Sequence, residues 1–586
     1  MNDLFKKNIN IPLLDRAQNA VAKFTPGEKM LFWILAFSMV ISGIIITSKV
    51  SDSFAETIPK RGGTITEGVM GSPRFINPIL AISDADRDIS SLVFSGLVRP
   101  TTDGKFIPDL AESYNISEDG LVYTFNLRTN LKFHDNTNIT ADDIIFTISK
   151  MIDPEIKSPK RAEWEGVEIT KTDDYAIIMK LKRPFSGLLE NASVGIIPKH
   201  IWKDFNAEEF TFSGENISPI GSGPYKVDSI EKTKNGIPKI YHLTSFKKYL
   251  PEPSFIKNLN IKLYPGEKEL ILGFENQEID LMGGVSSSEA KILSEKGYRV
   301  ERMRLPRIFG VFFNQSHENI LAEIEIRKAL EMTAPKDEII NTVLFGYAEK
   351  LYGPLPSATL GQNFEIKLTN ATSSSTDEFI LNAQKMLEKS GWSKNKETGI
   401  YEKTVKNSKE TKIFSFSLSL PNTEEMIMVA NILKTTWEKL GAKVDLKIFE
   451  QSDLKQNVIK TRKYGALLFG EVLGKNPDLY AFWHSQQRFD PGYNISMYTN
   501  SKVDKLIEKS RISKNQEDQR SVNKQIDEEI SKDYPAIFLY APDYIYVLPK
   551  NLKGFTSYII GDPAERLSSV LNWHLNTEKV WEVFLK

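Results

Sequence analysis

The longest apolar segment of the chain lies near its N-terminus. Residues 30–47 read MLFWILAFSMVISGIIIT and contain no charged side chain. Eighteen helical residues rise about 27 Å, which is close to the hydrocarbon thickness of a bilayer. No other segment of the chain shows this pattern. It predicts a single transmembrane helix rather than the several spans of a permease.

The charges before this segment predict its orientation. Basic residues outnumber acidic ones there, and positive charge tends to stay in the cytoplasm, so we expect the large C-terminal part outside the cell membrane. A buried core helix is one alternative. A cleaved signal peptide is the other, because residues 53–55 (SFA) offer small side chains near a possible cleavage point. The long head favours an uncleaved anchor. We therefore expect a cytoplasmic head at 1–29, the anchor at 30–48 and a polar linker at 49–61.

Beyond the anchor, strand and helix patterns alternate along the chain. Residues 121–127 (LVYTFNL) alternate in the manner of a strand. Residues 140–143 (TADD) offer a threonine N-cap followed three residues later by an acid. Residues 424–440 have apolar positions at helical spacing and end at Gly441. This interleaving predicts an α/β protein, mixed α+β in character, with mixed sheets.

Length and composition narrow the class of protein. The 586 residues exceed what one compact core accommodates, so two or three structural domains are expected. The net charge of -1 gives no electrostatic attraction to nucleic acid, and no such partner is expected. Cysteine is absent, which excludes disulfides, thiolate metal sites, cysteine nucleophiles and a cysteine lipid anchor.

Motifs of common enzymes and cofactor sites are missing. The chain has no P-loop, dinucleotide-binding glycine pattern, HExxH or GxSxG. The glycine-rich residues 221–224 (GSGP) end in a proline without the N–H that a phosphate cradle uses, so a backbone turn is the simpler interpretation. The six histidines are scattered without metal-ligand spacing. We predict neither a cofactor, a metal site nor a catalytic residue.

Six segments in order resemble a known family. The most specific order is P-D-L-A-E-S, then a hairpin, then F-H-D-x-T and T-A-D-D, all within the second segment. This order resembles bacterial extracellular solute-binding proteins of the dipeptide-, oligopeptide- and nickel-binding family, family 5. The segments are 62–80, 92–148, 218–227, 311–348, 476–485, and a C-terminal run with 499–507 and 534–540.

The resemblance implies a two-lobed fold of the periplasmic-binding-protein type. The lobes enclose the ligand between them, and the first lobe carries an extra subdomain. By position, residues 62–100, 216–305 and 541–586 are expected to form the first lobe. Residues 101–215 are then the extra subdomain, and residues 306–540 the second lobe.

The resemblance also points to ligand-binding residues in the first lobe. The loop at 71–75 matches the place where the family's first lobe contacts ligand, so we expect Ser72, Arg74 and Phe75 to contribute. The Arg74 guanidinium is suited to a two-pronged contact with a carboxylate. A solvated loop arginine is the alternative.

In the second lobe, many peptide-binding relatives hold the ligand's α-amine with an aspartate shortly before the place of the NPD sequence. In this chain that place falls at Gly474 or Lys475, which is a departure from the family pattern. Glu471 or Asp478 is expected to take over the role. A different ligand is the alternative.

Two further side chains have two interpretations each. Trp483 either stacks on the ligand or fills the core of the second lobe. Asn314 follows a strand whose alternate side chains face opposite ways, so it shares a face with Phe312 and not with Phe313. That face is either the cleft or the core.

These features predict a receptor and not an enzyme. We expect a membrane-anchored, monomeric binding protein that captures a solute outside the cell, closes its lobes on it, and presents it to the permease subunits of an ABC importer. Peptide is the commonest ligand that the family implies. An anchored extracellular hydrolase and a tethered peptide-binding chaperone remain alternatives.

Overall fold

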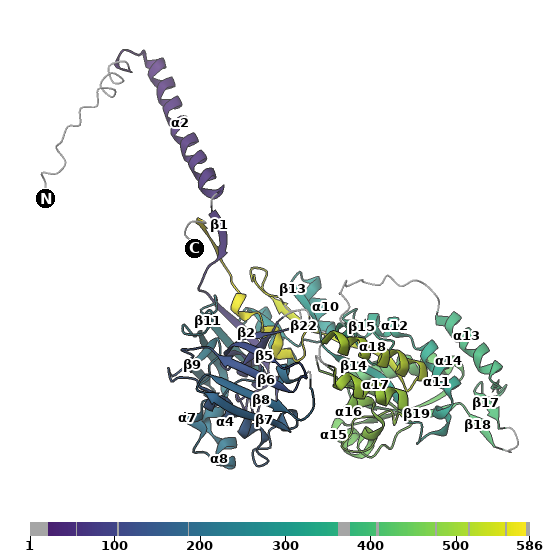
Figure 1. Ribbon diagram of the computed structural model, residues 1–586. Helices are drawn as coiled ribbons and strands as arrows, with labels where there is room; N and C mark the ends of the chain where they lie inside the picture. Colours follow the sequence, from purple (N-terminus) through teal and green to yellow (C-terminus); the bar gives the residue numbers. More distant parts are fainter. Residues whose placement is uncertain are drawn as a thin grey trace. The chain divides into compact units, whose positions relative to one another are not determined.

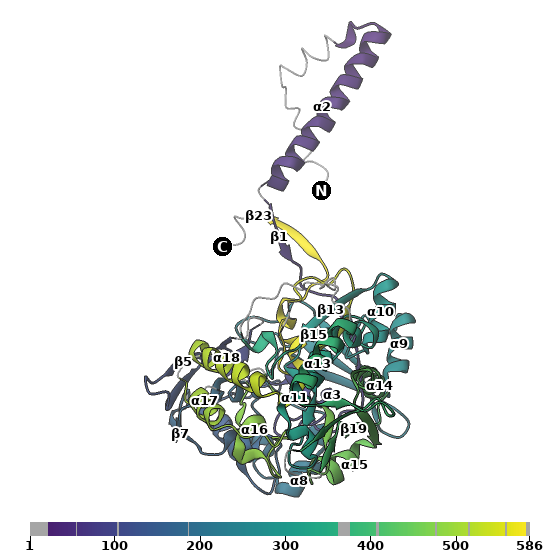
Figure 2. The same cartoon turned by 90° about the vertical axis from the view of Figure 1, so that its right-hand side faces the viewer.

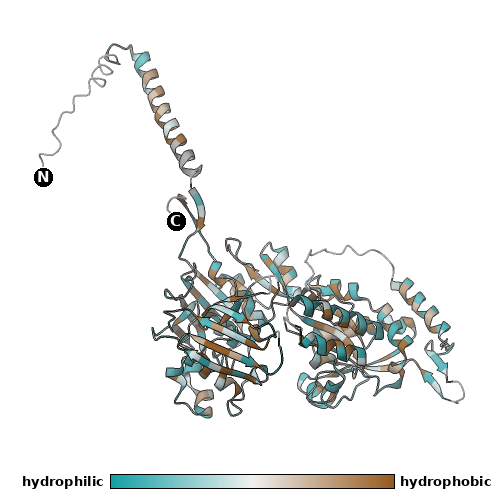
Figure 3. Cartoon of the chain, viewed as in Figure 1, coloured by the Kyte–Doolittle hydropathy of each residue, from teal (hydrophilic) through white to brown (hydrophobic). Residues whose placement is uncertain are grey.

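The apolar N-terminal segment forms one long helix, α2 (Pro26–Ser53). The computed structural model describes residues 21–581 apart from 54, 102–104, 186, 361–375, 406–409, 475–476, 514–515 and 557–558. Within α2, residues Pro26–Ile46 have a mean hydropathy of 2.2, and their side chains are not buried (Figures 1 and 3). The helix is therefore long and apolar enough to cross a bilayer, as the sequence pattern predicts.

The segment after the apolar stretch is not the polar linker that the sequence predicts. Helix α2 continues to Ser53, and strand β1 (Ala55–Pro59) pairs antiparallel with β23 (Thr577–Trp581) from the end of the chain. Residues 575–586 accordingly group with the N-terminal segment and not with the first lobe. The local pattern could not reveal this pairing, because the partner strand lies more than 500 residues away in the chain.

Residues Arg61–His574 form the second compact unit, built on a sheet of twelve strands. Strand β22 (Ala536–Leu548) runs through its middle. Residues 536–540 of β22 pair with β14 (Arg307–Phe313), and residues 543–548 pair with β13 (Arg299–Arg304). The chain therefore passes between the two lobes in β22 and again between β13 and β14.

The first lobe packs helices on the half of the sheet that contains β2, β9–β12 and β13. Strand β2 lies between β11 and β12 and is parallel to both. Helix α9 packs apolar side chains such as Leu270 against this sheet, together with Met282 and Val547. The bounds are β2 Thr64–Met70, β9 Tyr225–Lys232, β10 Pro238–Ser245, β11 Asn258–Tyr264, β12 Leu281–Gly283, α3 Asp84–Val93, α9 Glu267–Glu275 and α10 Ser287–Glu295.

The extra subdomain is built on an antiparallel sheet of its own, in the order β5-β6-β8-β7. Helix α4 (Ala141–Ile152) begins with the predicted capping box, in which Asp143 accepts from the backbone of Thr140. A short hairpin, β3 (Val98–Pro100) and β4 (Phe106–Pro108), precedes the sheet. The other bounds are β5 Ala111–Ile116, β6 Val122–Leu127, α5 Arg161–Trp164, β7 Val167–Asp173, β8 Ala176–Leu181, α6 Leu188–Asn191, α7 Lys199–Trp202 and α8 Ala207–Phe212.

The second lobe has a sheet with helices on both faces. Alternate residues of β14 face opposite ways, as predicted: Val311 and Phe313 pack in one core cluster with α14, and Ile308 and Phe312 pack in the other. Figure 2 shows α17 and α18 together on one side of this lobe. The bounds are α11 Ile324–Thr333, α12 Lys336–Thr342, β15 Ala348–Lys350, α13 Thr376–Lys389, β16 Ser393–Lys394, β17 Tyr401–Thr404, β18 Thr411–Ile413, β19 Ser415–Pro421, α14 Glu424–Leu440, β20 Lys443–Phe449, α15 Gln451–Asp453, β21 Ala466–Val472, α16 Tyr480–Trp483, α17 Ser501–Arg511 and α18 Gln516–Asp533.

The glycines of the GSGP sequence are needed for a close backbone approach to α3. A Cβ atom at Gly221 would lie 2.0 Å from the carbonyl oxygen of Val93, and one at Gly223 would lie 2.5 Å from that of Leu92. The ring of His134 bridges the same segment, accepting from the N–H of Gly221 at 3.3 Å and bonding the carbonyl of Gly223 at 3.0 Å. The segment therefore fixes the end of α3, which forms part of the cleft described next.

Candidate ligand-binding cleft

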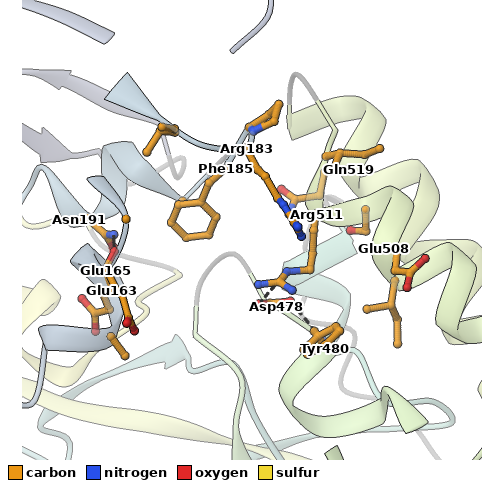
Figure 4. A pocket seen from close by; sticks show the side chains of 18 of the residues that line it. Glu163, Glu165, Arg183, Phe185, Asn191, Asp478, Tyr480, Glu508, Arg511 and Gln519 are labelled. Atoms are coloured by element: carbon orange, nitrogen blue, oxygen red, sulfur yellow. Dashed lines mark hydrogen bonds and ion pairs between the residues drawn. The ribbon is translucent and has the colours of Figure 1, made fainter. Parts of the chain in front are cut away.

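Two adjoining pockets lie between residues of the two lobes. The hairpin pocket, of about 650 Å³, is lined by α3, the β3–β4 hairpin and residues 561–571 on one side and by residues 473–482 on the other. The subdomain pocket, of about 900 Å³, lies between residues 162–191 of the extra subdomain and residues 477–519 of the second lobe (Figure 4). The two pockets share four lining residues, Glu163, Glu190, Asn191 and Asp478.

The second-lobe side of the subdomain pocket carries an ion pair stacked on aromatic rings. Asp478 accepts a hydrogen bond from the N–H of Tyr480 at 3.1 Å, and its carboxylate lies 3.3 Å from Nε of Arg511. The Arg511 guanidinium lies 4.5 Å from the centre of the Tyr480 ring, which in turn stacks on His484. Figure 4 shows Phe185 across the pocket from this group. The aromatic faces and the paired charges suit a ligand with both apolar and polar groups.

On the first-lobe side, α3 is held at its N-terminus by a capping box. Ser83 accepts from the N–H of Asp86, and the Asp86 carboxylate bonds back to the N–H of Ser83. The other Asp86 oxygen accepts from the backbone N–H groups of Arg74 and Phe75 at 2.7 and 2.9 Å. Two hydrogen bonds from the backbone of the loop at 71–75 to Asp86 thus tie the loop to α3.

A buried ion network holds α3 from behind. The Arg566 guanidinium donates to Glu67 of β2 at 2.9 Å and to Asp88 of α3 at 2.6 Å. Burial raises the pKa of Glu67 to about 7 in spite of the nearby positive charge of Arg566, and the Asp88 carboxylate adds to the rise. The Arg566 guanidinium therefore joins β2, α3 and its own segment, residues 561–571, into a fixed wall.

The β3–β4 hairpin brings a second buried carboxylate to the hairpin pocket. Asp109, directly after β4, accepts from the Tyr249 hydroxyl at 2.7 Å. Burial raises the pKa of Asp109 to about 6, opposed first by that hydrogen bond and then by the charge of Arg99. Arg99 on β3 and Ser90 on α3 line the same pocket. Sequence reasoning missed these residues, although Asp109 lies within the family-specific P-D-L-A-E-S sequence.

The loop at 71–75 contributes little to these two pockets. Ser72 and Arg74 are exposed, and neither is among the described residues that line the hairpin or subdomain pocket. The Arg74 guanidinium lies 5.5 Å from the centre of the Phe75 ring. Phe75 lines a different pocket of about 690 Å³ together with Phe212. The ligand role of the loop therefore stays a prediction.

Two of the predicted second-lobe residues are part of its packed interior. Trp483 is 1% exposed and packs with Phe312 and Phe538 in one core cluster. Asn314 is 2% exposed, and its amide donates to the carbonyl of Arg462 at 2.8 Å. Of the two interpretations of each residue, the structure agrees with the core interpretation, and a ligand role for either stays a prediction.

The two candidate acids of the second lobe differ sharply in surroundings. Glu471 is 6% exposed, and its Oε2 has no hydrogen-bond partner among the described residues. Burial raises the pKa of Glu471 well above its usual value, and the charge of Arg462 only partly opposes this. Asp478, in contrast, lines both pockets. Of the two, the structure brings only Asp478 to the cleft, where it already has Arg511 as partner.

Fold and cleft together define a two-lobed solute-binding protein. The family model of the bacterial extracellular solute-binding proteins, family 5 (middle region), matches residues 105–502, and the chain belongs to this family. It is 26% identical over 561 residues to the oligopeptide-binding protein AppA of Bacillus subtilis, an alignment that covers 93% of this chain and 98% of AppA.

Solved structures agree with this assignment of the fold. AppA in complex with a nonapeptide superposes with a TM-score of 0.64 at 24% identity, covering 89% of this chain and 100% of that one. The ABC transporter substrate-binding protein CtaP of Listeria monocytogenes gives 0.72 at 25% identity. NikZ of Campylobacter jejuni in complex with Ni(L-His) gives 0.65 at 26% identity. Both of these cover 88% of this chain and 100% of the other chain.

Proposed function

We propose that this protein is an extracytoplasmic receptor that binds peptides in the cleft between its lobes and delivers them to an ABC importer. The observation that carries the proposal is the pair of adjoining pockets of about 650 and 900 Å³, lined from both lobes. Their combined lining is long and mixed in polarity, which suits an extended chain better than one compact solute. The oligopeptide-binding relative AppA and its nonapeptide complex support the same ligand class.

The proposed working motion uses the two places where the chain passes between the lobes. Strand β13 ends at Arg304 and β14 begins at Arg307, and β22 changes partner between Tyr540 and Asp543. We place the lobe boundaries there, with residues 62–100 and 216–305 in the first lobe. A ligand that contacts both walls favours the closed arrangement by its higher affinity for that state.

We further propose that α2 is a retained single-pass membrane anchor. The apolar stretch Pro26–Ile46 supports a span, and a cleavable signal sequence has the same character. The pairing of Ala55 with Trp581 favours retention, because cleavage after residue 55 would remove this pair from the end of β1. The mass of the mature protein purified from membranes tests this. A mass that corresponds to a chain with its N-terminal segment supports the anchor. A mass that corresponds to a chain beginning near residue 55 contradicts it.

The receptor role is tested by its bound ligand. The full chain, purified in mild detergent, is denatured and the released small molecules are identified by mass spectrometry. Recovery of intact peptides supports the proposal. Added peptides that are steadily hydrolysed would place the protein among enzymes, and recovery of a non-peptide solute would leave the receptor role but change the ligand.

A further inference from the structure

The hairpin pocket holds three basic side chains, and two of them are already paired. Nε of Arg87 lies 2.9 Å from Asp562, and Nζ of Lys160 lies 3.4 Å from Glu163. Arg99, the third, is half-buried, and its Nε is buried without a hydrogen-bond partner among the described residues. A guanidinium in this position has donors available for a ligand.

The hairpin geometry places Arg99 beside Asp109 on one face. Arg99 pairs with Ile107 across the hairpin, and the N–H of Asp109 bonds the carbonyl of Leu97 at 3.0 Å. Side chains two residues apart on a strand share a face, so those of Arg99 and Asp109 are diagonal neighbours. Both residues line the hairpin pocket.

Asp109 does not cancel the charge of Arg99. Two guanidinium groups, Arg99 and Arg128, act on the Asp109 carboxylate, which also accepts from the Tyr249 hydroxyl. The Nε of Arg128 donates to the backbone carbonyl of Asp109 at 2.8 Å. Within this group of three, two positive charges and one negative charge leave a positive charge, and of the two arginines only Arg99 is among the described residues that line the pocket. The other acidic lining residues are Glu163, Glu190, Asp478, Asp562 and Glu565, of which Glu163, Asp562 and Asp478 are paired with Lys160, Arg87 and Arg511.

A buried hydroxyl on the same wall also lacks a partner. Ser90 on α3 is 7% exposed and lines the hairpin pocket, and its hydroxyl has no hydrogen-bond partner among the described residues. Leaving a buried hydroxyl unsatisfied is costly, so such groups in native proteins usually have a partner. Arg99 and Ser90 therefore offer a charged and a neutral donor to the same pocket.

We infer that Arg99, assisted by the Ser90 hydroxyl, binds a carboxylate group of the ligand. This inference rests on the proposed peptide-binding function and adds the chemistry that the first-lobe wall selects. The planar guanidinium fork matches the two oxygens of a carboxylate. The carboxylate is either the C-terminus of a peptide or an acidic side chain, since both present the same group.

Three tetrapeptide libraries test the inference on the full chain in detergent. The first has free C-termini and no Asp or Glu, the second is the same library with amidated C-termini, and the third is amidated and contains Asp and Glu. Peptides retained after gel filtration are quantified by mass spectrometry. We expect wild type to retain the first library at least about tenfold better than the second, because a charge-assisted contact is lost on amidation. Retention of the third library above the second assigns the site to acidic side chains as well.

The variant Arg99→Gln identifies the group responsible. It removes the charge and keeps most of the side-chain volume, and we expect it to abolish the preference for free carboxylates while leaving the melting temperature near that of wild type. Arg61→Gln is the matched control, because Arg61 is paired with Glu252 and is not among the described residues that line either pocket. We expect it to keep the preference.

The outcomes separate the site from the function on which it rests. Equal retention of all three libraries by wild type, or an undiminished preference for carboxylates in Arg99→Gln, would overturn the carboxylate site and leave peptide binding in place. A wild-type protein that retains no peptide from any library would overturn the peptide function itself, and the carboxylate site with it.

Discussion

The two lobes line the cleft with different kinds of surface. The first-lobe wall presents the half-buried Arg99 and the buried Asp109 and Ser90 on a hairpin and on helix α3, and Arg566 holds α3 from behind. The second-lobe wall of the hairpin pocket is formed by Leu473, Gly474, Asp478, Ala481 and Phe482, next to an apolar core around Trp483. The difference teaches that, among the described residues, the first-lobe wall offers donors without a partner, whereas the charged groups Asp478 and Arg511 of the second lobe are already paired with each other.

The largest expected effect is on the free energy of unfolding, and it comes from replacing Arg566 behind the first-lobe wall. Arg566→Met leaves Glu67 and Asp88 buried without their cation, which costs about 3–5 kcal/mol of unfolding free energy. Chemical denaturation of the full chain in detergent measures it. Lys291→Met is the control, because Lys291 forms an exposed pair with Glu295 and is expected to change stability by less than about 1 kcal/mol. Equal losses in the two variants would mean that the buried network does not support the first-lobe wall.

The next test separates core packing from ligand stacking in the second lobe. Trp483→Phe shrinks a side chain that is 1% exposed, so we expect unfolding free energy to fall by about 1–2 kcal/mol. Peptide affinity should change by less than about twofold, since the ring packs on Phe312 and Phe538. Isothermal titration calorimetry beside denaturation checks both. A tenfold loss of affinity at unchanged stability would restore Trp483 as a ligand contact.

Two buried acids, one in each lobe, predict a pH dependence of stability with the same sign. The folded-state pKa of Glu67 is raised to about 7, so the stability that it contributes is full below the usual pKa near 4.5 and is lost as pH rises toward 7. The pKa of Glu471 is also raised, with no hydrogen-bond partner at Oε2, so its loss has the same sign. Each acid gives a slope of at most about 1.4 kcal/mol per pH unit.

The variants Glu67→Gln and Glu471→Gln test this pH dependence. Denaturation midpoints between pH 4.5 and 8 should show a weaker pH dependence in each variant than in wild type. A dependence identical to wild type in either variant would show that the acid concerned is not protonated in the folded protein under these conditions.

The smallest expected effect distinguishes the two candidate acids at the ligand. Asp478→Asn should weaken peptide binding, by up to about tenfold or 1.4 kcal/mol, because Asp478 lines both pockets. Glu471→Gln should leave affinity unchanged, since Glu471 is not among the described residues that line them. Isothermal titration calorimetry of one peptide with both variants measures the two affinities. Weaker binding in Glu471→Gln alone would return the amine-binding role to Glu471.

Capping and helix-ending residues predicted the bounds of helices well, because a helix end depends on residues that are neighbours in the sequence. The Thr140 and Asp143 box starts α4, and Gly441 ends α14 at a φ of 110°. The β1–β23 pairing was missed because its two strands come from opposite ends of the chain. Strand β1 is stabilised by pairing with a strand that is distant in the sequence, and no pattern in residues 49–61 indicates which segment that is.

The candidate site was predicted less well for a related reason. The family segments predicted Asp478 as a ligand-binding residue, and it lines both pockets, so its ligand role stays a prediction. The exposure of a side chain, in contrast, is set by tertiary packing. Glu471 and Trp483 flank the same short segment and are buried instead. Arg99 and Asp109 were passed over because a single arginine and a single aspartate ten residues apart carry no signal until a hairpin places them on one face.

The central claim, that ligand is bound between two lobes that close on it, can be tested by one distance. The chain has no cysteine, so Lys182→Cys on the extra subdomain and Arg520→Cys on α18 can be spin-labelled without background. Pulsed electron paramagnetic resonance measures the distance between the labels with and without a saturating peptide whose binding is confirmed in the same sample. The account predicts a shorter and narrower distance distribution on binding. An unchanged distribution in a fully occupied sample would contradict it.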